Sequence, residues 1–294
     1  MHHIFSDILG WLNLNGVILS GLTDLPDTSW FDVFSFLGFW AIVWLPIAFL
    51  VSRLINWQPK EPLTPQQKLV LLASLYVLAP GIIAAKIKAE SISISDLGLS
   101  LIPGSLWYVL LGLGVSLASL ILIFSLESIS SLVIWHWQNA QKMLTLLVPI
   151  LGLSLLISFV EELIFRGYIF AALLKDNSPL VAAIASSFIF AILHLVWERK
   201  QTFPQLPGLW LMGMVLVMAR VLSNDTIYFS LGLHAGWIWG LTCIDSADLL
   251  SYKADNHWFT GIQQQPLAGI AGILCMLGTG LAIWLGSVPL LPIN

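Results

Sequence analysis

Long apolar runs, each about the length needed to cross a lipid bilayer, constrain this sequence more than any other feature. A transmembrane helix needs roughly 20 predominantly apolar residues, because each residue adds about 1.5 Å to its length. Eight such runs are predicted, at about 33–55, 68–85, 104–126, 143–174, 179–197, 206–222, 227–244 and 266–286. Backbone groups inside lipid must bond within their own segment, which favours helices. We therefore expect an all-α bundle of about eight transmembrane helices.

The composition agrees with a membrane protein and argues against several other classes. Only 10% of the 294 residues are charged and the mean hydropathy is +0.90, whereas a soluble domain carries about 25% charged residues. The net charge of -4 is small and no basic tract is present, so a nucleic-acid partner is not expected. Cys243 and Cys275 both lie in apolar runs and are interpreted as small buried hydrophobes. We expect an integral, multi-pass protein whose partners are membrane lipid and membrane-associated molecules.

The links between the runs are too short for a soluble domain, so residues 1–294 are predicted to form a single membrane domain. Residues 1–29 contain no Lys or Arg, unlike a secretory signal peptide, and their apolar positions predict a helix lying in the membrane interface. Residues 127–142 are more polar and are predicted to form an amphipathic connector at the surface.

The candidate functional residues are five of the ionisable side chains that lie within the apolar runs. Glu161, Glu162 and Arg166 lie in the fourth run, His194 in the fifth and His234 in the seventh. An ionisable residue within a membrane segment is costly, and it marks a candidate functional site by default.

Helical spacing separates the two glutamates. Residues i and i+4 share a helix face, so Glu162 and Arg166 are predicted to pair. Glu161 is rotated by about 100° and lacks a local cation, which makes it a candidate general base or acid. His194 and His234 could converge on Glu161 across the bundle. A carboxylate and an imidazole can bind and deprotonate a water, and a second imidazole can stabilise the oxyanion that forms on an attacked carbonyl.

The same side chains are compatible with other functions. Two histidines and one glutamate make a plausible zinc set, although no His-Glu-x-x-His motif is present. Buried carboxylates could relay protons in a transporter or channel, but the sequence has no evident internal repeat of the kind common in secondary transporters. A buried Glu–Arg pair, or a histidine in a membrane helix, can also serve helix packing alone.

The order of the motifs resembles the CPBP family, which comprises type II CAAX prenyl proteases, bacteriocin-processing proteins and abortive-infection-like membrane proteins. Three segments carry the resemblance, within a motif core at 143–245: Glu161-Glu162-Leu163-Ile164-Phe165-Arg166, then Phe190 to His194, then His234 onward. The resemblance implies a metal-independent intramembrane glutamic endopeptidase without a cofactor. Its substrate would be a membrane-associated peptide or protein, and its location a bacterial cytoplasmic or other inner membrane.

The resemblance also implies a role for each site residue. Glu161 and His194 would activate the water, and Glu162 with Arg166 would hold the site in shape. His234 would help form the oxyanion hole. The remaining motif residue, Phe190, would support the site.

One position departs from the family pattern. The third motif usually reads His-x-x-x-Asn, and here Ile238 stands four residues after His234. An isoleucine side chain cannot donate a hydrogen bond, and the loss of one oxyanion donor can lower a rate by about 100- to 1,000-fold. Trp237 or Trp239 could supply an indole N–H instead. The alternative function is a catalytically silent membrane scaffold, assembly or immunity protein that binds partner helices through the same cavity.

Overall fold

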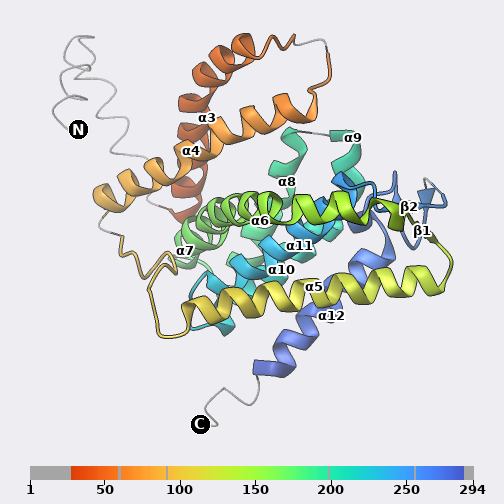
Figure 1. Cartoon of the computed structure of the whole chain (residues 1–294). Coiled ribbons are helices and arrows are strands. Elements are labelled where there is room, and N and C mark those ends of the chain that lie inside the picture. The colour runs from red at the N-terminus through yellow and green to blue at the C-terminus, as the bar shows by residue number, and fades with distance from the viewer. Residues whose placement is uncertain (1–27, 59–60, 91, 198, 255, 288–294) are drawn as a thin grey trace.

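The chain folds into a bundle of helices (Figure 1). The computed structural model describes residues 28–287 except 59, 60, 91, 198 and 255. Eight long helices lie within this part: α3 (Ser29–Leu54), α4 (Pro65–Glu90), α5 (Ser105–Ile129), α6 (Ala140–Glu162), α8 (Pro179–Leu193), α10 (Leu206–Leu222), α11 (Tyr228–Ser246) and α12 (Ile270–Ser287). The all-α prediction is confirmed. The expected interfacial segment 1–29 lies outside the described residues, apart from Thr28 and Ser29, which cap and begin α3.

Short elements join the long helices. A π-helical segment, η2 (Leu163–Ile169), continues α6 into α7 (Phe170–Leu174). The other short helices are η1 (Trp137–Asn139), η3 (His194–Val196), α9 (Arg199–Thr202), η4 (Phe203–Gln205) and η5 (Pro266–Ala268). Because α6, η2 and α7 follow one another without a break, they extend one long apolar stretch through the bundle.

The expected count of eight membrane spans is corrected to six. Within the described residues, six helical stretches are long and apolar enough to cross a membrane: Ser29–Leu54, Pro65–Lys88, Ser105–Ile129, Trp137–Leu174, Pro179–Val196 and Arg199–Leu222. The seventh and eighth expected runs are helical but fall short. The apolar part of α12, Ile270–Gly286, is too short, and polar residues such as His234 and Asp245 dilute the apolar character of α11. Six candidate spans still support an integral, multi-pass membrane protein.

α11 tolerates His234 because other helices cover the first half of α11, whereas Asp245 is exposed near its end. It packs against α5, α6 and α10, and its first half is buried. Glycines let α5 approach closely: a Cβ added at Gly232 would lie 2.1 Å from the Val109 carbonyl oxygen, and one at Gly112 would lie 2.5 Å from that of Phe229. Small residues serve this purpose at helix crossings in membranes. The crossing fixes the part of α11 that carries His234.

Gly232→Ala is expected to weaken the crossing of α5 and α11. The new methyl group would meet backbone atoms, so the two helices must separate, and overpacking of this kind typically costs about 1–3 kcal/mol. We expect a lower midpoint of thermal unfolding in detergent, followed by tryptophan fluorescence. Gly114→Ala on α5 is the matched control, because nothing lies within 4 Å of its added Cβ. Equal midpoints for the two variants would contradict the importance of this contact.

The segment 127–142 does not form the expected amphipathic connector. α5 continues to Ile129, and β1 (Val133–Trp135) then pairs antiparallel with β2 (Leu250–Tyr252). A second small sheet joins β3 (Asn256–His257) to β4 (Gly261–Ile262). The partner strand β2 comes from the distant link after α11, so the local sequence pattern could not indicate this pairing. Nearby, a hydrogen bond from Lys142 lowers the pKa of Asp248 below its ordinary value.

Candidate functional site

The site begins where α6 becomes π-helical. Glu161 and Glu162 end α6, and every residue of η2 is buried. Short π-helical segments occur frequently at functional sites. Here the buried Arg220 of α10 holds the segment, because it donates hydrogen bonds to the Gly167 carbonyl at 3.3 Å and to the Asp96 carbonyl at 2.8 Å. The long helix is thereby tied to α10 just beyond the two glutamates.

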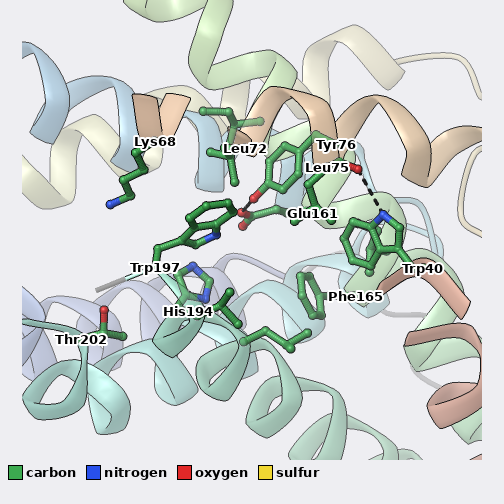
Figure 2. A pocket seen from close by; sticks show the side chains of 14 residues that line it. Trp40, Lys68, Leu72, Leu75, Tyr76, Glu161, Phe165, His194, Trp197 and Thr202 are labelled. Carbon is green, nitrogen blue, oxygen red and sulfur yellow. Dashed lines mark hydrogen bonds between the residues drawn. The ribbon is translucent and has the colours of Figure 1, made fainter. Parts of the chain in front are cut away.

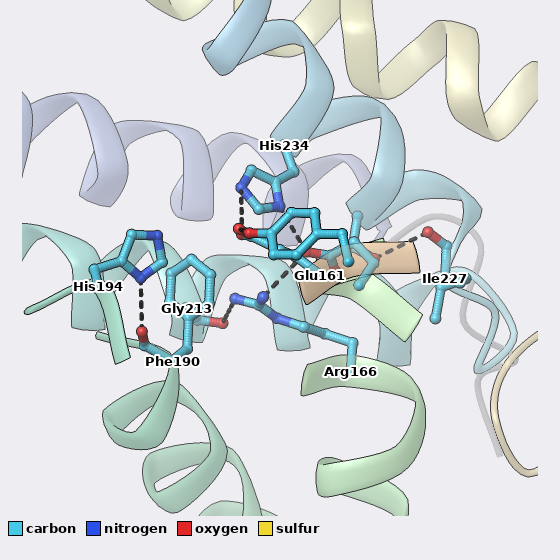
Figure 3. A network of polar contacts seen from close by, with 10 residues as sticks. Glu161, Arg166, Phe190, His194, Gly213, Ile227 and His234 are labelled. Carbon is cyan, nitrogen blue, oxygen red and sulfur yellow. Dashed lines mark hydrogen bonds and ion pairs between the residues drawn. The ribbon is translucent and has the colours of Figure 1, made fainter. Parts of the chain in front are cut away.

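Glu162 and Arg166 form the expected ion pair, and it is fully buried. Arg166 Nη1 donates to Glu162 Oε1 at 3.0 Å, with side-chain exposures of 1% and 0%. Arg166 Nη2 also donates to the Gly213 carbonyl at 3.4 Å, and its guanidinium lies 4.4 Å from the centre of the Phe190 ring (Figure 3). A buried charge requires such partners to offset its desolvation. The pair therefore fastens η2 to α8 and α10.

His234 of α11 contacts both glutamates, and Figure 3 shows it beside Glu161. Its Nδ1 is 2.9 Å from Glu162 Oε1, and its Nε2 is 3.5 Å from Glu161 Oε2. Since an ionised carboxylate only accepts hydrogen bonds, Nδ1 donates to Glu162. Both ring nitrogens thus face carboxylates, and His234 is not among the side chains that line the pocket described below. Its contacts connect Glu161 to the buried ion pair.

His194 begins η3, directly after α8, and is partly exposed. Its Nδ1 lies 2.7 Å from the Phe190 carbonyl oxygen. A carbonyl only accepts, so Nδ1 carries the proton, and Nε2 is the acceptor nitrogen when the ring is neutral. The Phe190 ring contacts both imidazoles, with centroid distances of 4.5 Å to His194 and 5.8 Å to His234. The Phe190 side chain therefore packs against both histidine rings.

A pocket of about 260 Å³ exposes Glu161 and His194 to the same space (Figure 2). α4 forms one wall of this pocket, and the Tyr76 hydroxyl donates a hydrogen bond to Glu161 Oε1. The sequence interpretation missed Tyr76, because an uncharged aromatic residue in an apolar run resembles a packing residue. Lys68 and Thr202 also line the pocket, and the remaining lining is apolar: Trp40, Leu72, Leu75, Ile157, Ile164, Phe165, Leu193, Val196 and Trp197.

The residues around Ile238 offer no replacement for the missing asparagine. Trp237 Nε1 donates to Ser119 Oγ at 3.0 Å, and Trp239 Nε1 donates to the Leu147 carbonyl at 2.9 Å. Neither tryptophan lines the pocket. The expectation that an indole could supply the oxyanion donor is therefore not supported by this geometry.

The candidate zinc set does not assemble in the described part of the chain. No group of three His, Cys, Asp or Glu side chains there is placed to hold a metal ion. The two cysteines are free thiols, Cys243 buried and Cys275 partly buried. The chemistry available in the pocket is that of a carboxylate, an imidazole, a phenol, a hydroxyl and an ammonium group.

Comparison with known proteins identifies the motif region. Residues 143–240 match a family model described as Rce1-like, type II CAAX prenyl endopeptidase. The match covers a third of the chain and contains all three motifs, so the resemblance to the CPBP family is confirmed over this segment. At the family level, it supports a CAAX-protease-type membrane endopeptidase. No curated protein and no solved structure matches the chain.

Proposed function

We propose that this membrane protein, a CPBP-family chain by its segment 143–240, is an intramembrane glutamic endopeptidase that hydrolyses a peptide bond in a membrane-associated peptide or protein. The observation that carries the proposal is the placement of Glu161 and His194 in one cavity, with the Glu161 carboxylate beside Tyr76 and His234. A carboxylate and an imidazole that reach the same water can activate it for attack on a carbonyl.

Glu161 is the general base in the proposed reaction. A water in the pocket gives one proton to the Glu161 carboxylate while its oxygen attacks the carbonyl carbon of the peptide bond. His194 accepts a hydrogen bond from the same water at Nε2 and orients it, since the Phe190 carbonyl fixes the proton on Nδ1. The protonated Glu161 then gives its proton to the amide nitrogen as the C–N bond breaks. The products are a new carboxyl terminus and a free amine.

Tyr76 is the proposed donor to the oxyanion. Its hydroxyl bonds to the Glu161 carboxylate, which becomes a weaker acceptor once it takes the proton from water. The hydroxyl can then donate to the negative oxygen that develops on the attacked carbonyl, in an enclosed site where such a donor is effective. His234 is proposed to position Glu161 against the buried ion pair, which differs from the oxyanion role that the family resemblance implies.

Tyr76→Phe is expected to lower kcat by about 10- to 100-fold with little change in KM, because a hydrogen bond to a charged group contributes about 1.5–3 kcal/mol. The measurement is the rate of peptide cleavage in liposomes as a function of substrate concentration. Tyr108→Phe on α5 is the control, because the Tyr108 hydroxyl accepts a hydrogen bond from Asn224 and Tyr108 does not line the pocket. A normal kcat for Tyr76→Phe would remove Tyr76 from the mechanism.

The activity itself is tested with purified protein in liposomes and a library of membrane peptides that includes prenylated CAAX-type peptides. We expect cleavage of at least one peptide, located by mass spectrometry and unaffected by EDTA. His194→Ala is expected to abolish it while the protein remains folded. Activity that EDTA removes and zinc restores would contradict a metal-independent mechanism, and a folded protein that cleaves no member would contradict an enzyme.

A silent scaffold is the second candidate function, and Ile238 together with the engaged indoles of Trp237 and Trp239 favours it. It predicts a partner membrane protein that co-purifies and crosslinks to residues of the pocket. In that case Glu161→Ala would retain the partner, because binding through apolar walls does not need a base. Cleavage that depends on Glu161 would contradict this alternative.

A further inference from the structure

We propose that an anionic phospholipid binds in a groove beside η3 and holds His194 in the pocket that contains Glu161. The inference rests on the proposed function, because it assigns regulation to the same site. The groove has a volume of about 460 Å³, and sites for small molecules usually have roughly 300–1,000 Å³. Five apolar side chains and one cation line it: Ile192, Leu193, Leu195, Val196, Phe203 and Arg199.

The groove lies at the turn between two candidate membrane spans. One span ends at Val196 and the next begins at Arg199. Such a turn lies near the headgroup layer, where the apolar core of the bilayer ends. Several apolar side chains of the groove face outward, since Val196 is 57% exposed and Phe203 is 70% exposed. In a membrane, the chains of a lipid are the partners available to these side chains.

Arg199 makes the groove complementary to an anion. Arg199 and its neighbour Lys200 are both exposed, and none of the ion pairs between described residues includes either of them. A guanidinium group can bind a phosphate through two parallel hydrogen bonds, and basic residues near a membrane surface attract anionic lipid. A cation combined with apolar walls fits a ligand that has an anionic headgroup and an apolar chain, as an anionic phospholipid has.

The short turn η3 separates this groove from the pocket that contains Glu161. His194 lines the pocket (Figure 2), Leu195 lines the groove, and Val196 lines both. Leu193, directly before η3, also lines both. A single 3₁₀ turn has poor hydrogen-bond geometry of its own, so side-chain packing must contribute to its position. A lipid chain packed against η3 from the groove would therefore keep His194 beside Glu161.

Lipid binding is measured on the Glu161→Gln protein, so that the result does not depend on hydrolysis. Native mass spectrometry from nanodiscs of mixed phosphatidylcholine and phosphatidylglycerol should detect one retained phosphatidylglycerol. The double variant Arg199→Gln with Lys200→Gln should bind it about 10- to 30-fold more weakly, because each basic residue near a membrane surface contributes about fivefold. The matched control is Arg53→Gln with Lys88→Gln, which removes the same two charges from exposed positions outside the groove and should retain the lipid.

Hydrogen exchange of residues 193–197 tests the link to His194. In Glu161→Gln, exchange should be about fivefold slower in vesicles that contain phosphatidylglycerol than in phosphatidylcholine alone. The double variant Arg199→Gln with Lys200→Gln should lose this protection. In the wild type, phosphatidylglycerol should raise kcat for peptide cleavage by a similar factor. A larger share of phosphatidylglycerol should restore kcat in the double variant, which structural damage would not allow.

The outcomes separate this proposal from the proposed hydrolysis. Retained phosphatidylglycerol that protects η3, in a protein that cleaves no peptide, would support the lipid site and overturn the peptidase. Cleavage at equal kcat in both lipids, without slower exchange, would overturn the lipid site and leave the peptidase standing. Equal protection by inorganic phosphate in phosphatidylcholine vesicles would assign the groove to free phosphate. A crosslink from Phe203 to a second copy of the chain that phosphatidylglycerol does not displace would assign it to self-association, and either result would overturn the lipid.

Discussion

Glu161→Gln is expected to lower kcat for peptide cleavage by about 10²- to 10⁴-fold, the usual contribution of a general base. Glutamine has nearly the same shape as glutamate and can still contact Tyr76 and His234, but its amide cannot take a proton from water. The loss should therefore fall on kcat, with KM close to the wild-type value. Initial rates in liposomes give both constants, and tryptophan fluorescence in detergent reports whether the fold is retained.

Glu127→Gln provides the matched control for Glu161→Gln. Glu127 is also a buried carboxyl group, 2% exposed, but it lies on α5 and does not line the pocket with His194. We expect this variant to cleave at the wild-type rate. Equal losses in the two variants would indicate general damage from removing a buried carboxyl group. A wild-type rate for Glu161→Gln would exclude Glu161 as the base.

The positions of the helices were predictable because lipid imposes a simple rule on the sequence. An apolar run of sufficient length must be helical, and all eight predicted runs are helical in the structure. The count of spans failed at α12, whose apolar part is too short, and at α11, whose buried first half packs against α5, α6 and α10. A helix segment surrounded by protein can carry His234 and several glycines. The composition of such a segment therefore does not indicate whether the helix spans the membrane. The β1–β2 pair was missed for a different reason, since it joins links that lie far apart in the chain.

The candidate site was predictable where its contacts are local. Glu162 and Arg166 are four residues apart, and helical spacing alone brings them together. The contact between Tyr76 and Glu161 spans 85 residues, and nothing in the apolar run of α4 distinguishes Tyr76 from a packing residue. The π-helical segment η2 could not be predicted either. All of its residues are buried, and no polar face in its sequence marks where the helix type changes.

Arg166→Met is expected to cause the largest loss of stability. It leaves the fully buried Glu162 carboxylate without its cation, and breaking a buried ion pair in this way costs about 3–5 kcal/mol. Typical proteins are stable by only about 5–15 kcal/mol, so a large fall in the unfolding midpoint in detergent is expected. The double variant Glu162→Gln with Arg166→Met removes both charges, and it should recover part of the loss because no uncompensated charge remains.

The exposed ion pair of Lys142 and Asp248 is the control for Arg166→Met. Its nitrogen–oxygen distance of 2.7 Å is shorter than that of the buried pair, but its side chains are 51% and 77% exposed. Water already solvates both charges, so Lys142→Met should leave the unfolding midpoint unchanged. If Arg166→Met also left the midpoint unchanged, Glu162 would have to be neutral in the folded protein. A double variant no more stable than Arg166→Met alone would instead assign the loss to the contacts of Arg166 with Phe190 and Gly213, because those contacts are absent from both variants.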